Sequence, residues 1–417
     1  MGAQKDRMFW KFRAYGFLKN LRFFDPFLIL FLRDAGMTYL AIGSLYAVRE
    51  IATNILEIPT GVVADAFGRR RAMMFAFGAY LCAFALFGLF TSYRAFAVAM
   101  LLFALGEALR SGTHKAMILE HLRQSGTEDQ RVAYYGRTRA ASQFGSALAA
   151  LIGAGVVFST GAYRMVFLAS MIPYVLGLAL MCSYPRSLDG HVEGGHRSWR
   201  DILGALRGTV RASILALRSP PLLRGLFSGA TFDAVFRSTK DYLQPILQAQ
   251  ALALPVLGAC QEEQRVGIIV GGLFFLIYLT TSFASSRAGH VQQRARSLSA
   301  AVNLAYALGM GLLVAAGAFA AGGWSLGAIA AFLVLYSVQN VRRPMVVGYI
   351  SDWIDPRTMA TGLSVETQLR TVLTAIFAPL VGLTADRLGV GFAVLALGAI
   401  ALIGYPLVRL RETSRTV

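Results

Sequence analysis

The sequence predicts an all-α, polytopic membrane protein with twelve transmembrane helices in two related six-helix halves. Three observations support this fold class: an apolar composition, apolar segments long enough to cross a bilayer, and an uneven distribution of basic residues. Hydrophobic residues make up 56% of the 417 residues and charged residues only 15%, and the mean hydropathy is +0.56. A soluble protein of this length would carry more charge on its surface, so we expect a membrane-embedded chain.

Apolar segments close to the roughly 20 residues that cross a bilayer recur along the whole chain. In the first half they are 15–33, 39–63, 72–92, 95–119, 138–160 and 163–183. In the second half they are 223–247, 265–284, 298–321, 324–347, 360–384 and 389–409. The spacing therefore predicts six spans on each side of a central polar interval.

Basic residues are concentrated in alternate connections between these segments. The formal net charge is +18, from 40 basic and 22 acidic residues. With the N-terminus inside, the internal connections contain Arg69–Arg71 and the arginine-rich interval 186–218, whereas external turns contain isolated cations such as Arg94. This asymmetry places both termini in the cytoplasm. The excess charge then faces anionic lipids of the inner leaflet, so we expect no nucleic-acid partner.

A polar interval at 184–222 separates the two halves. Apolar residues recur at three- and four-residue steps between Trp199 and Leu217, with arginines on another face, which predicts a helix lying along the membrane surface. The predicted organisation is a six-helix bundle at 1–183, a cytoplasmic linker at 184–222 and a second six-helix bundle at 223–417.

The two halves also resemble each other in their motifs. Asp25-Pro26 aligns with Gln244-Pro245, and Arg110 aligns with Arg342 in the tenth span. Repeated six-span halves are typical of carriers that hold a substrate near the membrane midplane and expose it to each side in turn.

The stretch between the second and third spans combines Glu57, Gly61, Asp65, Gly68 and Arg69. We expect Gly61 to permit close backbone packing and Gly68 to permit a tight reversal. This stretch resembles the loop signature of the major facilitator superfamily, and its Glu-x-Pro-Thr-Gly start is similar to the efflux-type branch. The sequence departs from the signature at Ala66, where the family usually has a basic residue.

The resemblance implies a twelve-helix transporter fold and a cytoplasmic gate. In the superfamily the acid and base of this loop contact the cytoplasmic ends of neighbouring helices. Glu120 stands at the end of the fourth span, so we expect Arg69 to pair with Glu120, with Asp65 and Glu57 supporting the gate. The alternative for the arginines is that they only enforce topology, which we favour for Arg70 and Arg71.

Charged residues inside the first six spans are candidate substrate or proton-coupling groups, because such charges are costly in a membrane. Asp25 is either a protonatable coupling group or the partner of a cation on another helix. Arg49 and Glu50 point about 100° apart on a helix, so we expect them not to pair with each other. Each either finds a partner on another helix or lines the cavity, and we favour the cavity. Glu107 and Arg110 are three residues apart and form either a local pair or part of the site.

The later spans contain a second set of candidates. Asp233, Arg237 and Asp241 are spaced as a ladder that neutralises itself, which leaves Lys240 as the better ligand candidate. Arg342 lies beside Arg343, and one of the two is expected to extend toward the cytoplasm. The many cations favour an anionic or zwitterionic amphiphile over a cationic drug as substrate.

These observations predict a secondary active transporter of a small amphipathic solute, working by alternating access and coupled to protons as an efflux system of the cytoplasmic membrane. The alternatives are a lipid translocator and a transport-like sensor that only binds. The chain lacks G-x-x-x-x-G-K-[ST], H-E-x-x-H and G-x-S-x-G motifs, and its five His and three Cys residues form no ligand spacing. We therefore expect no enzyme activity, no cofactor and no metal, and a monomeric protein.

Overall fold

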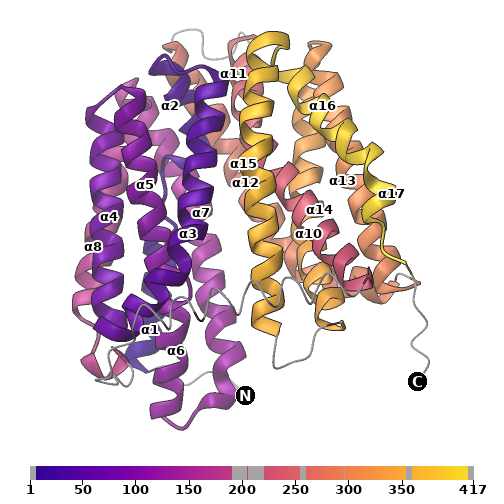
Figure 1. Cartoon of the computed structure of the whole chain (residues 1–417). Helices are drawn as coiled ribbons and strands as arrows, with labels where there is room; N and C mark the ends of the chain where they lie inside the picture. The colour runs from indigo at the N-terminus through magenta and orange to yellow at the C-terminus, as the bar shows by residue number, and fades with distance from the viewer. Residues whose placement is uncertain are drawn as a thin grey trace. The chain divides into compact units, whose positions relative to one another are not determined.

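A computed structural model describes residues 6–189, 204, 220–253, 260–294, 296–353 and 359–411. In the described residues all regular structure is helical (Figure 1). The first half contains α1 (Arg7–Leu18), η1 (Asp25–Phe27), α2 (Leu28–Asp34), α3 (Tyr39–Phe67), α4 (Arg69–Leu89), α5 (Tyr93–Arg110), α6 (Thr113–Gln124), η2 (Glu128–Gln130), α7 (Arg131–Thr160), α8 (Met165–Cys182) and η3 (Arg186–Asp189). The second half contains α10 (Pro220–Thr239), η4 (Lys240–Tyr242), α11 (Leu243–Ala253), α12 (Glu262–Arg294), α13 (Leu298–Ala321), α14 (Ser325–Ser351), α15 (Met359–Leu388), α16 (Val390–Ile403) and α17 (Tyr405–Val408).

The helices follow the predicted order of spans and confirm the all-α membrane fold. Eight of them in the described ranges are long and apolar enough to cross a membrane by length and composition. The remaining spans fall on α1 with α2, on α3, on α10 with α11, and on α16 with α17. Large apolar side chains such as Phe75, which is 71% exposed, cover the outer surface, as expected for a surface in contact with lipid.

Four predicted spans are not single continuous helices, which corrects the sequence-based expectation. The first is interrupted between α1 and α2, the seventh between α10 and α11, and the twelfth between α16 and α17. Pro26, Pro245 and Pro406 lie at or just after these breaks. Proline has no backbone N–H and its ring clashes with the carbonyl four residues earlier, so the preceding turn leaves the α-helical path. The fourth span breaks between α5 and α6 at Gly112, whose φ is +79°.

Contacts between Cα atoms divide the chain into two compact units. The first consists of Met1–Gly36, Val48–Gly204 and Val256–Tyr278, and the second of Met37–Ala47, Ala205–Pro255 and Leu279–Val417. In the second unit, the Asp386 carboxylate accepts hydrogen bonds from the N–H groups of Tyr39 (2.9 Å) and Leu40 (2.8 Å) and so caps the start of α3. The predicted boundaries at 183 and 223 stay a prediction, and the predicted surface helix at 199–217 lies outside the described residues.

The first unit is built on close helix packing around α1, α4 and α7. In Figure 1, α4 lies beside α5 and α8, and α1 packs on α7. A side chain at Gly145 or Gly153 would approach the Phe17 or Phe23 carbonyl oxygen to 2.6 Å, so glycine at these positions permits the close packing of α7 on the first span. The core of this unit is aromatic; Phe24, for example, stacks on Phe167 with ring centroids 5.0 Å apart.

The second unit is built around α13, which packs against α14 and α16, and around α10, which packs against α15 (Figure 1). The break in the seventh span repeats that in the first span, because η4 precedes α11 as η1 precedes α2. Asp25-Pro26 and Gln244-Pro245 thus lie at or just after this break, each in its own unit, as their alignment in the sequence predicts.

Candidate functional site

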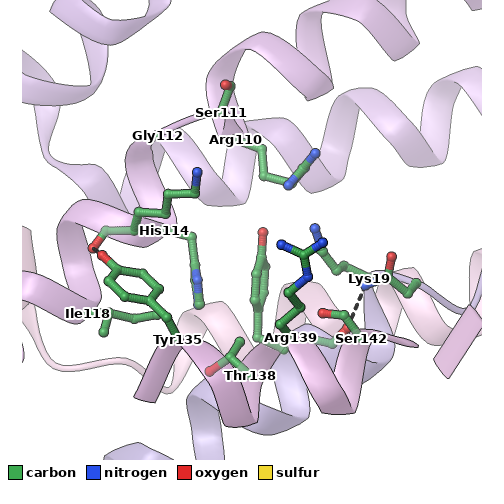
Figure 2. Close-up of a pocket in the computed structure, with 14 residues that line it drawn as sticks. Lys19, Arg110, Ser111, Gly112, His114, Ile118, Tyr135, Thr138, Arg139 and Ser142 are labelled. Atoms are coloured by element: carbon green, nitrogen blue, oxygen red, sulfur yellow. Dashed lines mark hydrogen bonds between the residues drawn. The ribbon is translucent and has the colours of Figure 1, made fainter. Parts of the chain in front are cut away.

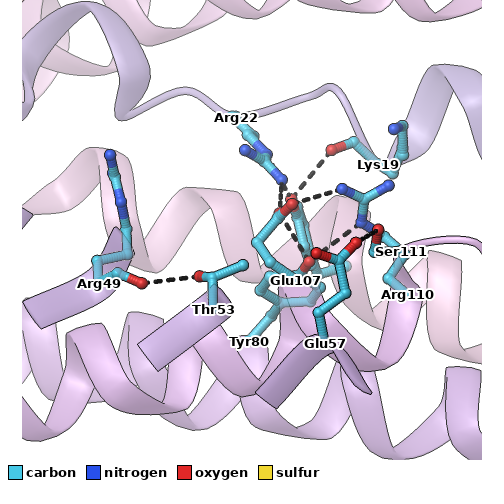
Figure 3. Close-up of polar contacts among 10 residues, drawn as sticks. Lys19, Arg22, Arg49, Thr53, Glu57, Tyr80, Glu107, Arg110 and Ser111 are labelled. Atoms are coloured by element: carbon cyan, nitrogen blue, oxygen red, sulfur yellow. Dashed lines mark hydrogen bonds and ion pairs between the residues drawn. The ribbon is translucent and has the colours of Figure 1, made fainter. Parts of the chain in front are cut away.

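A network of charged and tyrosine side chains surrounds Glu107 inside the first unit (Figure 3). Arg22 and Arg110 reach the two carboxylate oxygens of Glu107 from different sides, and the Arg110–Glu107 distance is 2.5 Å. The Tyr80 hydroxyl donates a third hydrogen bond to the carboxylate (2.7 Å). The carboxylate thus sits between two guanidinium groups, in the region where the fourth span is about to break.

The network depends on the break between α1 and η1. Residues 19–24 leave the helical path there, so the Arg22 side chain can cross to α5. The Arg22 Nε also donates to the Tyr174 hydroxyl (3.0 Å), which in turn donates to the Lys19 carbonyl (3.0 Å). An irregular backbone in a membrane protein is tolerated where it is buried in protein and its groups are satisfied, which is the situation here.

This network confirms the local pair between Glu107 and Arg110 that the i,i+3 spacing predicts. The sequence reasoning missed Arg22 as the second partner of Glu107, since that contact joins residues 85 positions apart. Asp25, the other candidate in this region, begins η1 and is half-buried. Its proposed coupling role stays a prediction.

Arg49 and Glu50 on α3 correct a second expectation. Their side chains form an ion pair of 3.4 Å, although adjacent helical residues point in different directions. The arginine side chain is long enough to curve back to its neighbour, which the argument from Cβ directions ignores. Further along α3, Glu57 accepts a hydrogen bond from the Ser111 hydroxyl (2.8 Å), at the break that separates α5 from α6 (Figure 3).

The two glycines of the loop signature differ in their surroundings: the expectation for Gly68 is confirmed and that for Gly61 is not. Gly68 has a φ of +98°, and a side chain there would lie 3.0 Å from the Asp189 carboxylate, so the tight reversal requires glycine. In contrast, no described atom lies within 4 Å of a Cβ built at Gly61, so the expected close approach is not present there. The Asp65 side chain lies outside the described residues, although its backbone belongs to α3.

Asp189 caps the helix that follows the signature, a contact that sequence reasoning did not identify. Its carboxylate accepts a hydrogen bond from the Arg70 backbone N–H (2.7 Å) in the first turn of α4. The Arg70 guanidinium donates to the carbonyl groups of Cys182 (3.3 Å) and Tyr184 (3.2 Å) after α8. The expectation that Arg70 serves topology alone is therefore wrong, because it joins the start of α4 to the end of α8.

The predicted gate residues Arg69 and Glu120 line one small cavity of about 290 Å³. Glu120 also accepts a hydrogen bond from the Gln124 side chain (2.9 Å), one helical turn later on α6. The two residues are thus brought to the same site, and their pairing as a gate stays a prediction.

A second buried polar network lies in the second unit, around Asp233 of α10. The Gln339 amide donates to Asp233 (2.7 Å), and the Arg370 guanidinium lies 3.8 Å from Asp233 and 4.0 Å from Glu366. Glu366 and Arg370 are one helical turn apart on α15, the spacing that favours such a pair. Three helices, α10, α14 and α15, contribute to this network.

The predicted ladder of Asp233, Arg237 and Asp241 is corrected by the end of α10 at Thr239. Because residues 240–242 form the 3₁₀ turn η4, the four-residue spacing of an α-helix no longer applies to Asp241. Asp241 instead pairs with its neighbour Lys240, and Asp233 pairs across helices with Arg370. Lys240 is therefore an ion-paired residue, contrary to the expectation that it lies free for a ligand.

Arg342 is buried and held by aromatic rings and a serine. Its exposed fraction is 1%, its guanidinium lies 4.4 Å from the Phe232 ring centroid, and it donates to the Ser228 carbonyl (2.8 Å) and hydroxyl (2.9 Å). Arg343 is exposed, and the extension of its side chain toward the cytoplasm stays a prediction. No group of three or more His, Cys, Asp or Glu side chains in the described ranges is arranged to hold a metal ion.

Comparisons with known proteins agree with this architecture. A sequence profile of the Major Facilitator Superfamily matches residues 19–365. A protein of Bacillus subtilis (strain 168), YxaM, described as an uncharacterized MFS-type transporter, is 25% identical over 275 residues, which are 64% of this chain and 64% of that protein. The match therefore spans less than two thirds of the relative's length.

Solved transporter structures share the fold at low sequence identity. The nucleoside transporter NupG superimposes with a TM-score of 0.74 at 10% identity, over 98% of this chain and all of that one. A D-xylose–proton symporter superimposes with a TM-score of 0.68 at 14% identity, over 97% of each chain. A peptide transporter POT in complex with sulfate has a TM-score of 0.67 at 15% identity, over 96% of this chain and 94% of that one.

Proposed function

Because the chain belongs to the major facilitator superfamily, we propose that it is a secondary active transporter that moves a small amphipathic solute by alternating access, in proton-coupled efflux. The family consists of transporters and not enzymes, in line with the prediction from motifs. The protein is a multi-pass membrane protein. We place it in the cytoplasmic membrane with both termini inside, on the charge asymmetry of its connections.

The observation that carries the proposal is the pair of polar networks at interrupted spans, one in each unit. Glu107 with its two arginines belongs to the first unit, and Asp233 with Arg370 belongs to the second. Ionisable side chains and broken helices within a membrane are costly, and in transporters they mark substrate and ion pathways. Two such sites in corresponding spans support a carrier more than a purely structural role.

Proton coupling requires a carboxyl group that can gain and lose a proton during the cycle. Asp25 is the candidate in the first unit, since it stands at the break next to the Arg22–Glu107 contact. In the second unit the candidate is Asp233, which accepts a hydrogen bond from the Gln339 amide and lies 3.8 Å from the Arg370 guanidinium. The D-xylose–proton symporter with the same fold is consistent with such coupling.

A lipid translocator is the second candidate, favoured by an apolar cavity in the second unit. This cavity of about 530 Å³ is lined by Phe227, Tyr306, Phe377 and Leu397 among other mainly apolar side chains. Its size and lining suit an acyl chain or the apolar part of an amphiphile.

Flux through purified protein in proteoliposomes tests the proposal. Liposomes containing the protein are loaded with a pH indicator, and amphipathic anions, zwitterions and cations are added with and without an imposed pH gradient. The transporter proposal predicts solute movement that depends on the gradient and is accompanied by proton movement. Binding of a solute without any flux under either condition would identify a sensor and contradict the proposal.

A further inference from the structure

A cationic pocket of about 660 Å³ lies inside the first unit, between α1, α6, α7 and the end of α5 (Figure 2). Four basic side chains line it: Lys19, Arg110, Lys115 and Arg139. None of its described lining residues is acidic. The volume falls within the roughly 300–1,000 Å³ that small-molecule sites occupy.

Three of these four cations have no carboxylate of their own. Arg110 is paired with Glu107, but Lys19, Lys115 and Arg139 form no ion pair with any described residue. Lys19 follows the end of α1, Lys115 lies on α6 and Arg139 on α7. Figure 2 shows the ends of Lys19, Arg110 and Arg139 directed into the same space. Cations that only obey the positive-inside rule have no reason to converge on one cavity, so their grouping indicates a negatively charged occupant.

The start of α6 adds a further anion-binding feature to the pocket. Gly112 has a φ of +79° and begins this 12-residue helix without a side-chain cap, and Gly112, His114 and Lys115 all line the pocket. The first N–H groups of a helix have no partner within it and attract anions.

Tyr15 supplies an independent observation that points to a ligand. Its side chain lines the pocket, it is only 2% exposed, and its hydroxyl oxygen makes no hydrogen bond of standard geometry within the described residues, although the Arg110 guanidinium lies close to it. Its ring is fixed by stacking on His114 with centroids 3.6 Å apart. A buried polar group without a partner is costly, and a bound oxyanion would satisfy the Tyr15 hydroxyl.

We propose that this pocket binds the oxyanion head group, a phosphate or carboxylate, of an amphipathic ligand. The positive charges of Lys19, Lys115 and Arg139 neutralise the head group, and the helix N–H groups and the Tyr15 hydroxyl orient it. The proposal names the substrate class of the transporter and in that respect rests on the proposed function, but binding itself is measured without transport. The same chemistry is offered by a soluble organic anion and by an anionic lipid head group.

Thermal unfolding of the full-length protein in a neutral detergent tests the proposal. Inorganic phosphate and a soluble short-chain alkyl phosphate are the soluble probes, and nanodiscs of phosphatidylglycerol or phosphatidylcholine are the lipid probes. A ligand of the folded state raises the apparent melting temperature. A higher melting temperature with the soluble anions identifies a site for a soluble solute. A higher melting temperature with phosphatidylglycerol alone identifies a site for a lipid head group.

Substitutions of pocket residues test whether the probe that raises the melting temperature binds in this pocket. Lys19→Gln and Arg139→Gln should each weaken binding of the protecting probe by roughly tenfold or more, because each removes a charge-assisted hydrogen bond. Lys19→Arg keeps the charge and should retain binding. The control Arg94→Gln removes an exposed cation in the first turn of α5 and should bind as the parent does.

Two results would overturn the pocket assignment: no protection by any anionic probe, or equal protection of the parent, the control and both pocket variants. If the protein shows gradient-driven flux but no anionic probe raises its melting temperature, the anion site is contradicted and the transporter proposal stands. If anions bind but no flux is observed, the proposed transport is contradicted and the proposed anion site stands.

Discussion

Replacing Glu107 with Gln tests whether the network in the first unit is held by charge. The substitution keeps the size of the side chain but leaves Arg22 and Arg110 without their shared anion. Removing one partner of a buried ion pair costs about 3–5 kcal/mol, because the remaining charge is left uncompensated. The Glu107 side chain is 22% exposed, so some solvent screens the arginines, and we expect a loss near the lower end, about 3 kcal/mol.

The loss is measured as the shift of the unfolding transition of the purified protein in detergent. Arg22→Gln combined with Glu107→Gln removes one charge of each sign, so the double variant should be more stable than the sum of the two single effects predicts. Contacting residues couple by about 0.5–3 kcal/mol. A Glu107→Gln variant as stable as the parent, or strictly additive effects in the double variant, would refute the reasoning.

Three further predictions concern the loop signature and the coupling group. Gly68→Ala should destabilise the protein by about 1–3 kcal/mol, because a residue with a side chain is then forced into a positive φ. The control Gly61→Ala should not destabilise it. Equal melting temperatures of the two variants would contradict this prediction. Asp25→Asn should abolish gradient-driven transport but keep counterflow exchange, and unchanged active transport would remove Asp25 from the mechanism. Arg69→Ala and Glu120→Ala should each increase the labelling of cytoplasmic-side cysteines by an impermeant reagent, and labelling at the parent level in both would count against the gate.

The positions of the spans follow from the sequence because a bilayer requires about 20 apolar residues for each crossing. The interruptions do not follow from proline alone. Pro26 and Pro245 stand at or just beyond a break, but Pro59, Pro173, Pro344 and Pro379 lie inside continuous helices. The sequence reasoning treated those spans as continuous because hydropathy does not fall at a broken helix inside a membrane.

The partners of the charged residues could be predicted only where they are close in the chain. The i,i+3 and i,i+4 pairs of Glu107 with Arg110 and of Glu366 with Arg370 follow from helix geometry. The contact between Arg22 and Glu107 depends on how α1 and α5 pack, and periodicity carries no information about that.

The cationic pocket in the first unit could not be predicted from the sequence either. Lys19 follows α1, whereas Lys115 and Arg139 lie on α6 and α7, about a hundred residues later, and a single sequence gives no sign that they share a cavity. The unpaired state of these cations also could not be predicted, because it requires knowing where every carboxylate lies. Composition pointed to an anionic or zwitterionic substrate, and the packed helices supply the place where such a group would bind.

Counterflow in proteoliposomes tests the central claim most directly. Liposomes are loaded with an excess of the unlabelled anionic amphiphile that protects the protein from thermal unfolding, and a trace of the labelled compound is added outside. A carrier that alternates its access predicts transient accumulation of the label inside the parent liposomes, weakened by Arg139→Gln and unaffected by Arg94→Gln. Binding of the label to the protein with no accumulation in any preparation would contradict the account.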